Sequence, residues 1–110
     1  MIYTSYFAKS GNLANAVSIA RSAPPGFKGE QMSMLAPSYK LLKDYKDFKI
    51  TNETYTEEFN EQLSSLNPKI VGGLAEGKVL LCWEGEDKFC HRHLVAEWLT
   101  KAGFKVEELK

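Results

Sequence analysis

The chain has 110 residues, of which 44% are hydrophobic and 25% are charged, as in ordinary soluble globular proteins with a core of their own. Its 14 basic and 14 acidic residues cancel. Nucleic acid is kept as a possible partner, although the net charge of zero gives no support for it. The sequence lacks a run of about 18 apolar residues and a signal-peptide pattern, so we expect no membrane span and a cytoplasmic location. Both cysteines are expected to be thiols in that reducing compartment.

The N-terminal part of the chain is predicted to begin with two strands. Residues 2–8 are rich in β-branched and aromatic side chains and run into a turn signal. Residues 15–21 form a second short apolar run, which is ended by the turn-forming Pro24-Pro25-Gly26. Residues 22–37 show no convincing period. A segment of this length in a small domain is usually a functional or mobile loop.

Three helices are predicted next. Residues 37–46 place Tyr39, Leu42 and Tyr45 on one face. Residues 51–66 form a stronger helix, with a cap at Thr51 or Asn52, acidic residues near its start and an apolar stripe. A short helix from Asn67-Pro68 to Gly77 has a capping residue, an N-terminal proline and a terminal glycine, although two internal glycines weaken it.

The C-terminal third is predicted to form a strand, a helix and a final strand. Residues 78–83 are continuously apolar, which is typical of a strand buried on both faces. A helix is expected from about Phe89 to Ala102, and a strand with an alternating pattern over residues 104–109. This order predicts a right-handed crossover and parallel pairing. We therefore expect one α/β domain over residues 1–110.

The crossover also locates a candidate site. Cys82, Trp83 and Glu84 stand where the buried strand ends, and residues 90–93 form the first turn of the following helix. Ligands of α/β sheets bind beyond the carboxyl ends of strands, where helix N-termini favour anions. The helix field and Arg92 would lower the pKa of the Cys90 thiol. The Arg92 guanidinium suits a phosphate or carboxylate, and Glu84 could act as an acid, a base or an orienting group.

Structural alternatives account for the same residues. If the apolar stripe of the last helix is extended by one turn towards its N-terminus, it includes Cys90 and His91. Cys90 could then be a buried thiol and His91 a histidine at the edge of the core, while His93 pairs with Glu97. A zinc site made of Cys82, Cys90 and one histidine has suitable ligand types, but the cysteine spacing is not that of a zinc knuckle. A Cys82–Cys90 disulfide is disfavoured on grounds of compartment.

Residues at the end of the second strand complete the candidate site. If the second strand and the strand ending at Cys82 are parallel neighbours, Arg21 and Ser22 would meet Arg92 at one mouth; the alternative is a solvated Arg21. Further candidates are the charges of Lys28 and Lys40, and a stacking platform for a base made by Trp83, Tyr39 and Phe27. Aromatic residues at regular spacing are, however, more often part of the core.

The stretch LLCWEGEDKFCHRHLVAEWL resembles the signature of domain-of-unknown-function family 488, in which a strand ending in Leu-Leu-Cys-aromatic-Glu is followed by an acidic loop and Cys-His-Arg. The matching positions are Leu80, Leu81, Cys82, Glu84, Cys90, His91 and Arg92. Residues 3–29 resemble the short-chain branch of that family. The sequence departs from the pattern at Ile19, where many longer members carry an acidic residue.

The resemblance implies a compact Rossmann-like domain, with a mostly parallel sheet flanked by helices and the motif residues gathered at one edge. It implies no reaction. Our first hypothesis is an enzyme that acts on an anionic small molecule, such as a nucleotide or another phosphate-bearing compound, without a metal or cofactor. Its catalytic residues would be Cys90, His91, Glu84 and Cys82, and its ligand-binding residues Arg92, Arg21, Ser22 and Trp83. The alternatives are a non-catalytic module that binds a nucleotide, nucleic acid or protein, and a purely structural role of the motif.

Overall fold

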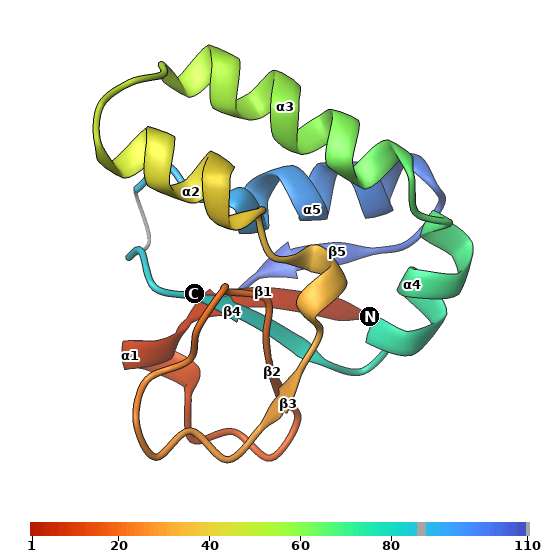
Figure 1. The fold of residues 1–110 in the computed structure, drawn as a ribbon. Helices are drawn as coiled ribbons and strands as arrows, with labels where there is room; N and C mark the ends of the chain where they lie inside the picture. Colours follow the sequence, from red (N-terminus) through yellow and green to blue (C-terminus); the bar gives the residue numbers. More distant parts are fainter. Residues whose placement is uncertain (86–87, 110) are drawn as a thin grey trace.

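The computed structural model, which describes residues 1–85 and 88–109, places five strands in one parallel sheet (Figure 1). The spatial order is β3-β2-β4-β1-β5, and every pair of neighbours is parallel. The strands are β1 (Ile2–Tyr6), β2 (Ala16–Ser18), β3 (Glu30–Gln31), β4 (Val79–Cys82) and β5 (Val106–Glu108). The expected α/β fold of Rossmann-like type is therefore confirmed.

Helices cover the two faces of the sheet unequally. Helices α2 (Tyr39–Lys46), α3 (Asn52–Ser64) and α5 (His91–Lys101) lie on one side, and the short α1 (Phe7–Ser10) lies on the other (Figure 1). Helix α4 (Pro68–Ala75) joins α3 to β4, and a 3-10 turn, η1 (Ser33–Leu35), precedes α2. Side-chain oxygens cap three of these helices as polar N-cap residues do, accepting from backbone N–H groups: Ser38 for α2, Thr51 for α3 and Asn67 for α4.

The core has two parts, one on each face of the sheet. Leu80 of β4 faces the larger part, which also contains Phe59 of α3 and Leu99 of α5. Val79 and Leu81 point the other way into a smaller cluster, since successive side chains of a strand alternate between faces. All residues of β4 are buried, which confirms the prediction for this strand and places its carboxyl end beneath protein on both sides.

Several element bounds differ from the sequence-based expectations. Strand β1 ends at Tyr6, and the chain turns into α1 so that the Phe7 ring packs edge-on against Phe27 and Trp83. The second strand covers only Ala16–Ser18. The segment 22–37 contains β3 and η1, which are too short to produce a readable period. Within the described ranges, no helix is both long and apolar enough to cross a membrane.

Candidate functional site

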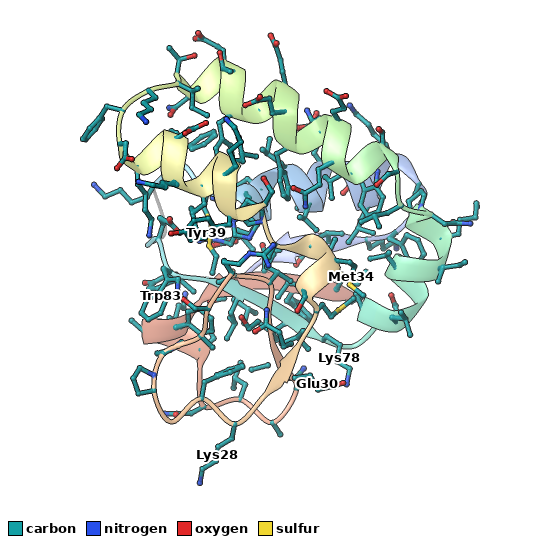
Figure 2. The ribbon with its side chains drawn as sticks, in the orientation of Figure 1. Lys28, Glu30, Met34, Tyr39, Lys78 and Trp83 are labelled. Carbon is teal, nitrogen blue, oxygen red and sulfur yellow. A yellow bond between two sulfur atoms is a disulfide. The ribbon has the colours of Figure 1, made fainter. Side chains whose placement is uncertain are left out.

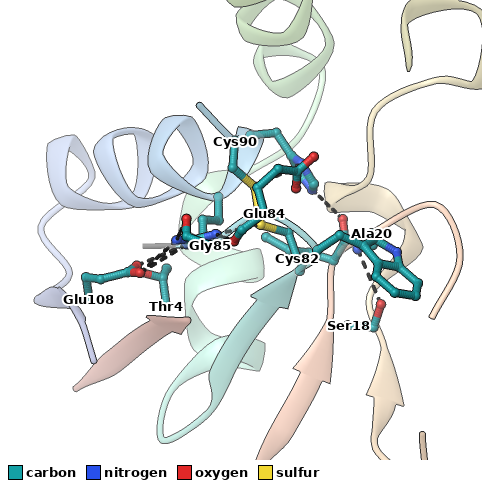
Figure 3. Close-up of a disulfide and its surroundings, with 12 residues drawn as sticks. Thr4, Ser18, Ala20, Cys82, Glu84, Gly85, Cys90 and Glu108 are labelled. Atoms are coloured by element: carbon teal, nitrogen blue, oxygen red, sulfur yellow. Dashed lines mark hydrogen bonds and ion pairs between the residues drawn. A yellow bond between two sulfur atoms is a disulfide. The ribbon is translucent and has the colours of Figure 1, made fainter. Parts of the chain in front are cut away.

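The two cysteines lie side by side at the carboxyl edge of the sheet. Cys82 is the last residue of β4, and Cys90 precedes α5 in an extended conformation, so this helix starts two positions later than expected. Both are buried and are joined in a disulfide (Figure 3). The prediction of two free thiols is therefore wrong for this structure, because the crossover brings together sulfurs that the sequence separates by eight positions.

Arg92 is fully buried beside the disulfide, with an exposed fraction of 0%. Its Nε and Nη2 groups donate to the Glu108 carboxylate of β5 at 2.8–3.2 Å. The remaining donors reach the backbone oxygens of Glu84 at 2.7 Å and Gly85 at 3.1 Å, and the Cys82 sulfur at 2.8 Å. These contacts use all five N–H bonds of the guanidinium.

The expected role of Arg92 as an anion-binding residue is therefore not retained. A guanidinium with no free N–H and no exposed surface cannot receive a phosphate without breaking its protein contacts. Arg92 instead ties the loop after β4 to strand β5. The pKa of Glu108 is lowered, because its hydrogen bonds from Arg92 and Thr4 outweigh the opposing effect of burial.

His91 is also buried, and its surroundings define its tautomer. Its Nε2 lies 2.6 Å from the backbone oxygen of Ile19, so this nitrogen must carry the proton and donate it. Nδ1 is then left with a lone pair, 3.8 Å from the Cys90 sulfur. Burial, assisted by the positive charge of Arg92, lowers the pKa of His91 to about 4. The imidazole is consequently neutral at pH 7.

A cavity of about 100 Å³ opens beside Cys90 and His91. This space is large enough for a group of at least a few heavy atoms, since about 10–15 Å³ suffices for one water. The cavity is lined by six of the eight predicted site residues: Arg21, Ser22, Trp83, Glu84, Cys90 and His91.

Arg21 supplies an exposed positive charge to this cavity. Its Nε and Nη2 both donate to the backbone oxygen of Pro37, at 3.1 and 2.9 Å. This leaves three N–H bonds without a partner among the described residues. Trp83, which is 50% exposed, donates from Nε1 to the backbone oxygen of Ser22 at 2.7 Å. The ends of β2 and β4 thus lie next to each other, as predicted. Arg21 shares the cavity wall with His91 and Cys90, and Arg92 is not part of that wall.

The cavity wall also contains a lysine and three aromatic residues that were not predicted as site residues. Lys46 of α2 adds a second positive charge, and three aromatic rings form a cluster with centroids 5.0–5.6 Å apart, namely Tyr45, Tyr55 and Phe89. Burial and the nearby Glu84 carboxylate raise the pKa of Tyr55. For Tyr45 and Tyr55 the sequence signal was present in their helical spacing, but the same spacing is typical of any core-facing stripe.

The weaker candidates do not line this cavity. Lys28 projects outward from the loop at the bottom of the view, away from Trp83 (Figure 2), and Lys40 pairs with Asp44 on the surface. Phe27 packs in the smaller core cluster, as the structural alternative predicted. Tyr39 is exposed outside the cavity wall.

Comparison with known families identifies the chain. A family model described as the active DUF488-N3 subclade matches residues 9–103. The chain belongs to the DUF488 family. This confirms the resemblance that the motif around Cys90-His91-Arg92 indicated. No curated protein matches the chain, and no solved structure matches it either. The DUF488 assignment brings no reaction with it, so the chemistry of the site has to be argued from its geometry.

Proposed function

We propose that this DUF488 protein is an enzyme acting on an anionic small molecule, with the reduced Cys90 thiol as its nucleophile. The observation that carries the proposal is the shared cavity: Arg21, Cys90 and His91 all line one small space, and His91 Nδ1 lies 3.8 Å from the Cys90 sulfur. An anion-binding group, a nucleophile and an acceptor for its proton are the minimum that nucleophilic catalysis needs.

The substrate would enter with its charged end. Arg21 and Lys46 would hold a phosphate or carboxylate group, for which the cavity volume of about 100 Å³ is sufficient. The remainder of the molecule would lie outside, where half-exposed Trp83 offers a flat apolar surface. A nucleotide bound by its phosphate and stacked by its base is one molecule of this kind.

The chemical step begins from the dithiol, which a thiol or phosphine reductant generates by supplying two electrons to the disulfide. The Cys90 S–H proton passes to His91 Nδ1 as the sulfur electron pair forms a bond to the electrophilic centre of the substrate. The leaving group departs with its bonding pair and takes the proton from the imidazolium. Attack by water or another acceptor then releases the sulfur, which recovers a proton as the thiol. Because the neutral imidazole is a weak base, the proton is expected to move during attack rather than beforehand.

Alkylation of the reduced protein by iodoacetamide tests whether the anion site and the thiol share one cavity. Inorganic phosphate should slow the modification of Cys90, measured by peptide mass spectrometry in the presence of a metal chelator. Lys28→Gln, which removes a charge away from the cavity, should retain the protection, and Arg21→Gln should lose it. Equal protection in the two variants, or none in the wild type, would show that Arg21 does not hold an anion next to Cys90.

Turnover separates an enzyme from a binding module. With p-nitrophenyl phosphate and a panel of nucleotides, the reduced wild type should release product and Cys90→Ser should not, while Cys90→Ser still binds phosphate in a calorimetric titration. Phosphate binding by the reduced wild type without turnover of any compound would favour the non-catalytic module. Turnover that Cys90→Ser preserves would rule out the thiol as nucleophile.

A further inference from the structure

The disulfide cysteines belong to a cluster of three metal-binding groups. Cys82, Glu84 and Cys90 each direct one ligand atom into a small region, and these atoms all lie within 4.8 Å of one another. Both sulfurs are buried, and Glu84 is half-buried. Two sulfurs and a carboxylate make a set that suits Zn²⁺, which binds thiolate, imidazole and carboxylate ligands.

His91 lies next to this cluster and would supply a fourth ligand. Its Nδ1 lies 3.8 Å from the Cys90 sulfur, and its Nε2–H donates to the Ile19 carbonyl. Metal-binding histidines show this arrangement, in which a carbonyl or carboxylate holds one ring nitrogen and the other nitrogen keeps its lone pair for the metal.

The Cα separation of the two cysteines is compatible with two thiolates that share one ion. The Cα atoms of Cys82 and Cys90 are 7.3 Å apart, beyond the roughly 4.4–6.8 Å that is usual for disulfides. Two thiolates bound to one Zn²⁺ at about 2.3 Å each have sulfurs about 3.8 Å apart. The two-to-four-residue spacing of a zinc knuckle does not apply here, because the cysteines come from two different elements that the crossover brings together.

We propose that the reduced protein binds one zinc-like cation through Cys82, Cys90 and His91 Nδ1, with the Glu84 carboxylate completing the coordination. A reductant of the thiol or phosphine class breaks the disulfide with two electrons, and the cation then displaces the two thiol protons to solvent. Two thiolates neutralise the divalent charge, and Arg92 donates to the Cys82 sulfur at 2.8 Å.

Zinc binding and the proposed reaction would use the same residues. Glu84, Cys90 and His91 all line the cavity, so a bound cation would face the space into which the substrate enters. Cys90 cannot be a metal ligand and a free nucleophile at the same time. Zn²⁺ is therefore expected to suppress alkylation of Cys90 and any thiol-dependent turnover.

Cobalt titration of the reduced protein tests the site directly. The reductant is removed without oxygen, and Co²⁺ is added to reduced and to oxidised wild type. The reduced protein should bind one equivalent, with thiolate-to-cobalt charge-transfer bands and the visible bands of tetrahedral Co²⁺, and Zn²⁺ should abolish both. The oxidised protein should show neither. Absence of the charge-transfer bands in the reduced protein, or equal binding by the oxidised protein, would overturn the proposal.

Variants identify the ligands. Cys82→Ser and Cys90→Ser should each weaken Co²⁺ binding by more than about 100-fold, because even the loss of an outer partner of a ligand costs roughly 10- to 100-fold. His93→Gln, which changes the exposed histidine of the same helix, should bind as the wild type does. Wild-type affinity in Cys90→Ser, or an equal loss in His93→Gln, would contradict the assignment.

Thermal unfolding gives a measurement that needs no variant. Zn²⁺ should raise the melting temperature of the reduced wild type and leave that of the oxidised protein unchanged, since only a ligand that binds the native state stabilises it. An unchanged melting temperature of the reduced protein would count against the site. The phosphate-protection experiment uses chelator and the cobalt titration uses no substrate, so either proposal can fail while the other stands.

Discussion

Replacing Arg92 by alanine tests the conclusion that this residue holds the structure together rather than a ligand. The substitution leaves the Glu108 carboxylate without its charge partner and removes the donors of the Glu84 and Gly85 carbonyls. Breaking one side of a buried ion pair costs about 3–5 kcal/mol. We therefore expect a loss of about 4 kcal/mol, a large part of the roughly 5–15 kcal/mol that stabilise a domain of this size. The melting temperature should fall by about 20 °C.

Urea unfolding followed by circular dichroism, with the disulfide intact, measures this loss. Lys101→Ala is the matched control, because Lys101 pairs with Glu97 from an exposed position on the same helix, and such pairs contribute less than about 1 kcal/mol. A double-mutant cycle with Glu108→Gln should give a coupling energy above about 1 kcal/mol between the two buried partners. A loss below about 1 kcal/mol in Arg92→Ala would refute the structural role and reopen a role in ligand binding.

Two further predictions concern stability. The pKa of His91 falls from 6.5 to about 4 on folding, so the unfolded chain gains a proton first as the pH is lowered. Unfolding free energy should drop by about 2 kcal/mol between pH 7 and 5 in urea titrations; His93→Gln should keep most of this slope, and a flat profile would contradict a buried neutral His91. Gly72→Ala and Gly73→Ala should have opposite effects in thermal unfolding. A Cβ at Gly72 would overlap the Phe104 ring, which predicts a loss of about 1–3 kcal/mol, whereas Gly73 faces open space and should gain up to about 1 kcal/mol. Equal effects of the two alanines would refute this packing.

Local patterns were sufficient for most of the fold. The continuous apolar run ending at Cys82 predicted a strand buried on both faces, and α3 and α4 begin at capping residues that the sequence identified. The strand-helix-strand order of the C-terminal third predicted parallel pairing. Helix α1 was not predicted, and its first two residues were assigned to the first strand, because the turn after Tyr6 depends on packing of the Phe7 ring against residues far along the chain. Contacts of that kind leave no local period.

The sequence by itself determined which residues meet at the carboxyl edge of the sheet, because strand and helix order decide which chain segments end there. Six of eight predicted site residues line one cavity for this reason. Only the tertiary structure decided what each of them does. Sequence patterns alone do not distinguish Arg21 from Arg92. In the structure, Arg92 is buried and pairs with Glu108 of strand β5, whereas Arg21 is exposed at the mouth of the cavity. The pairing, reactivity and accessibility of a side chain depend on its neighbours in space. These neighbours are often far away along the chain, so local sequence patterns do not identify them.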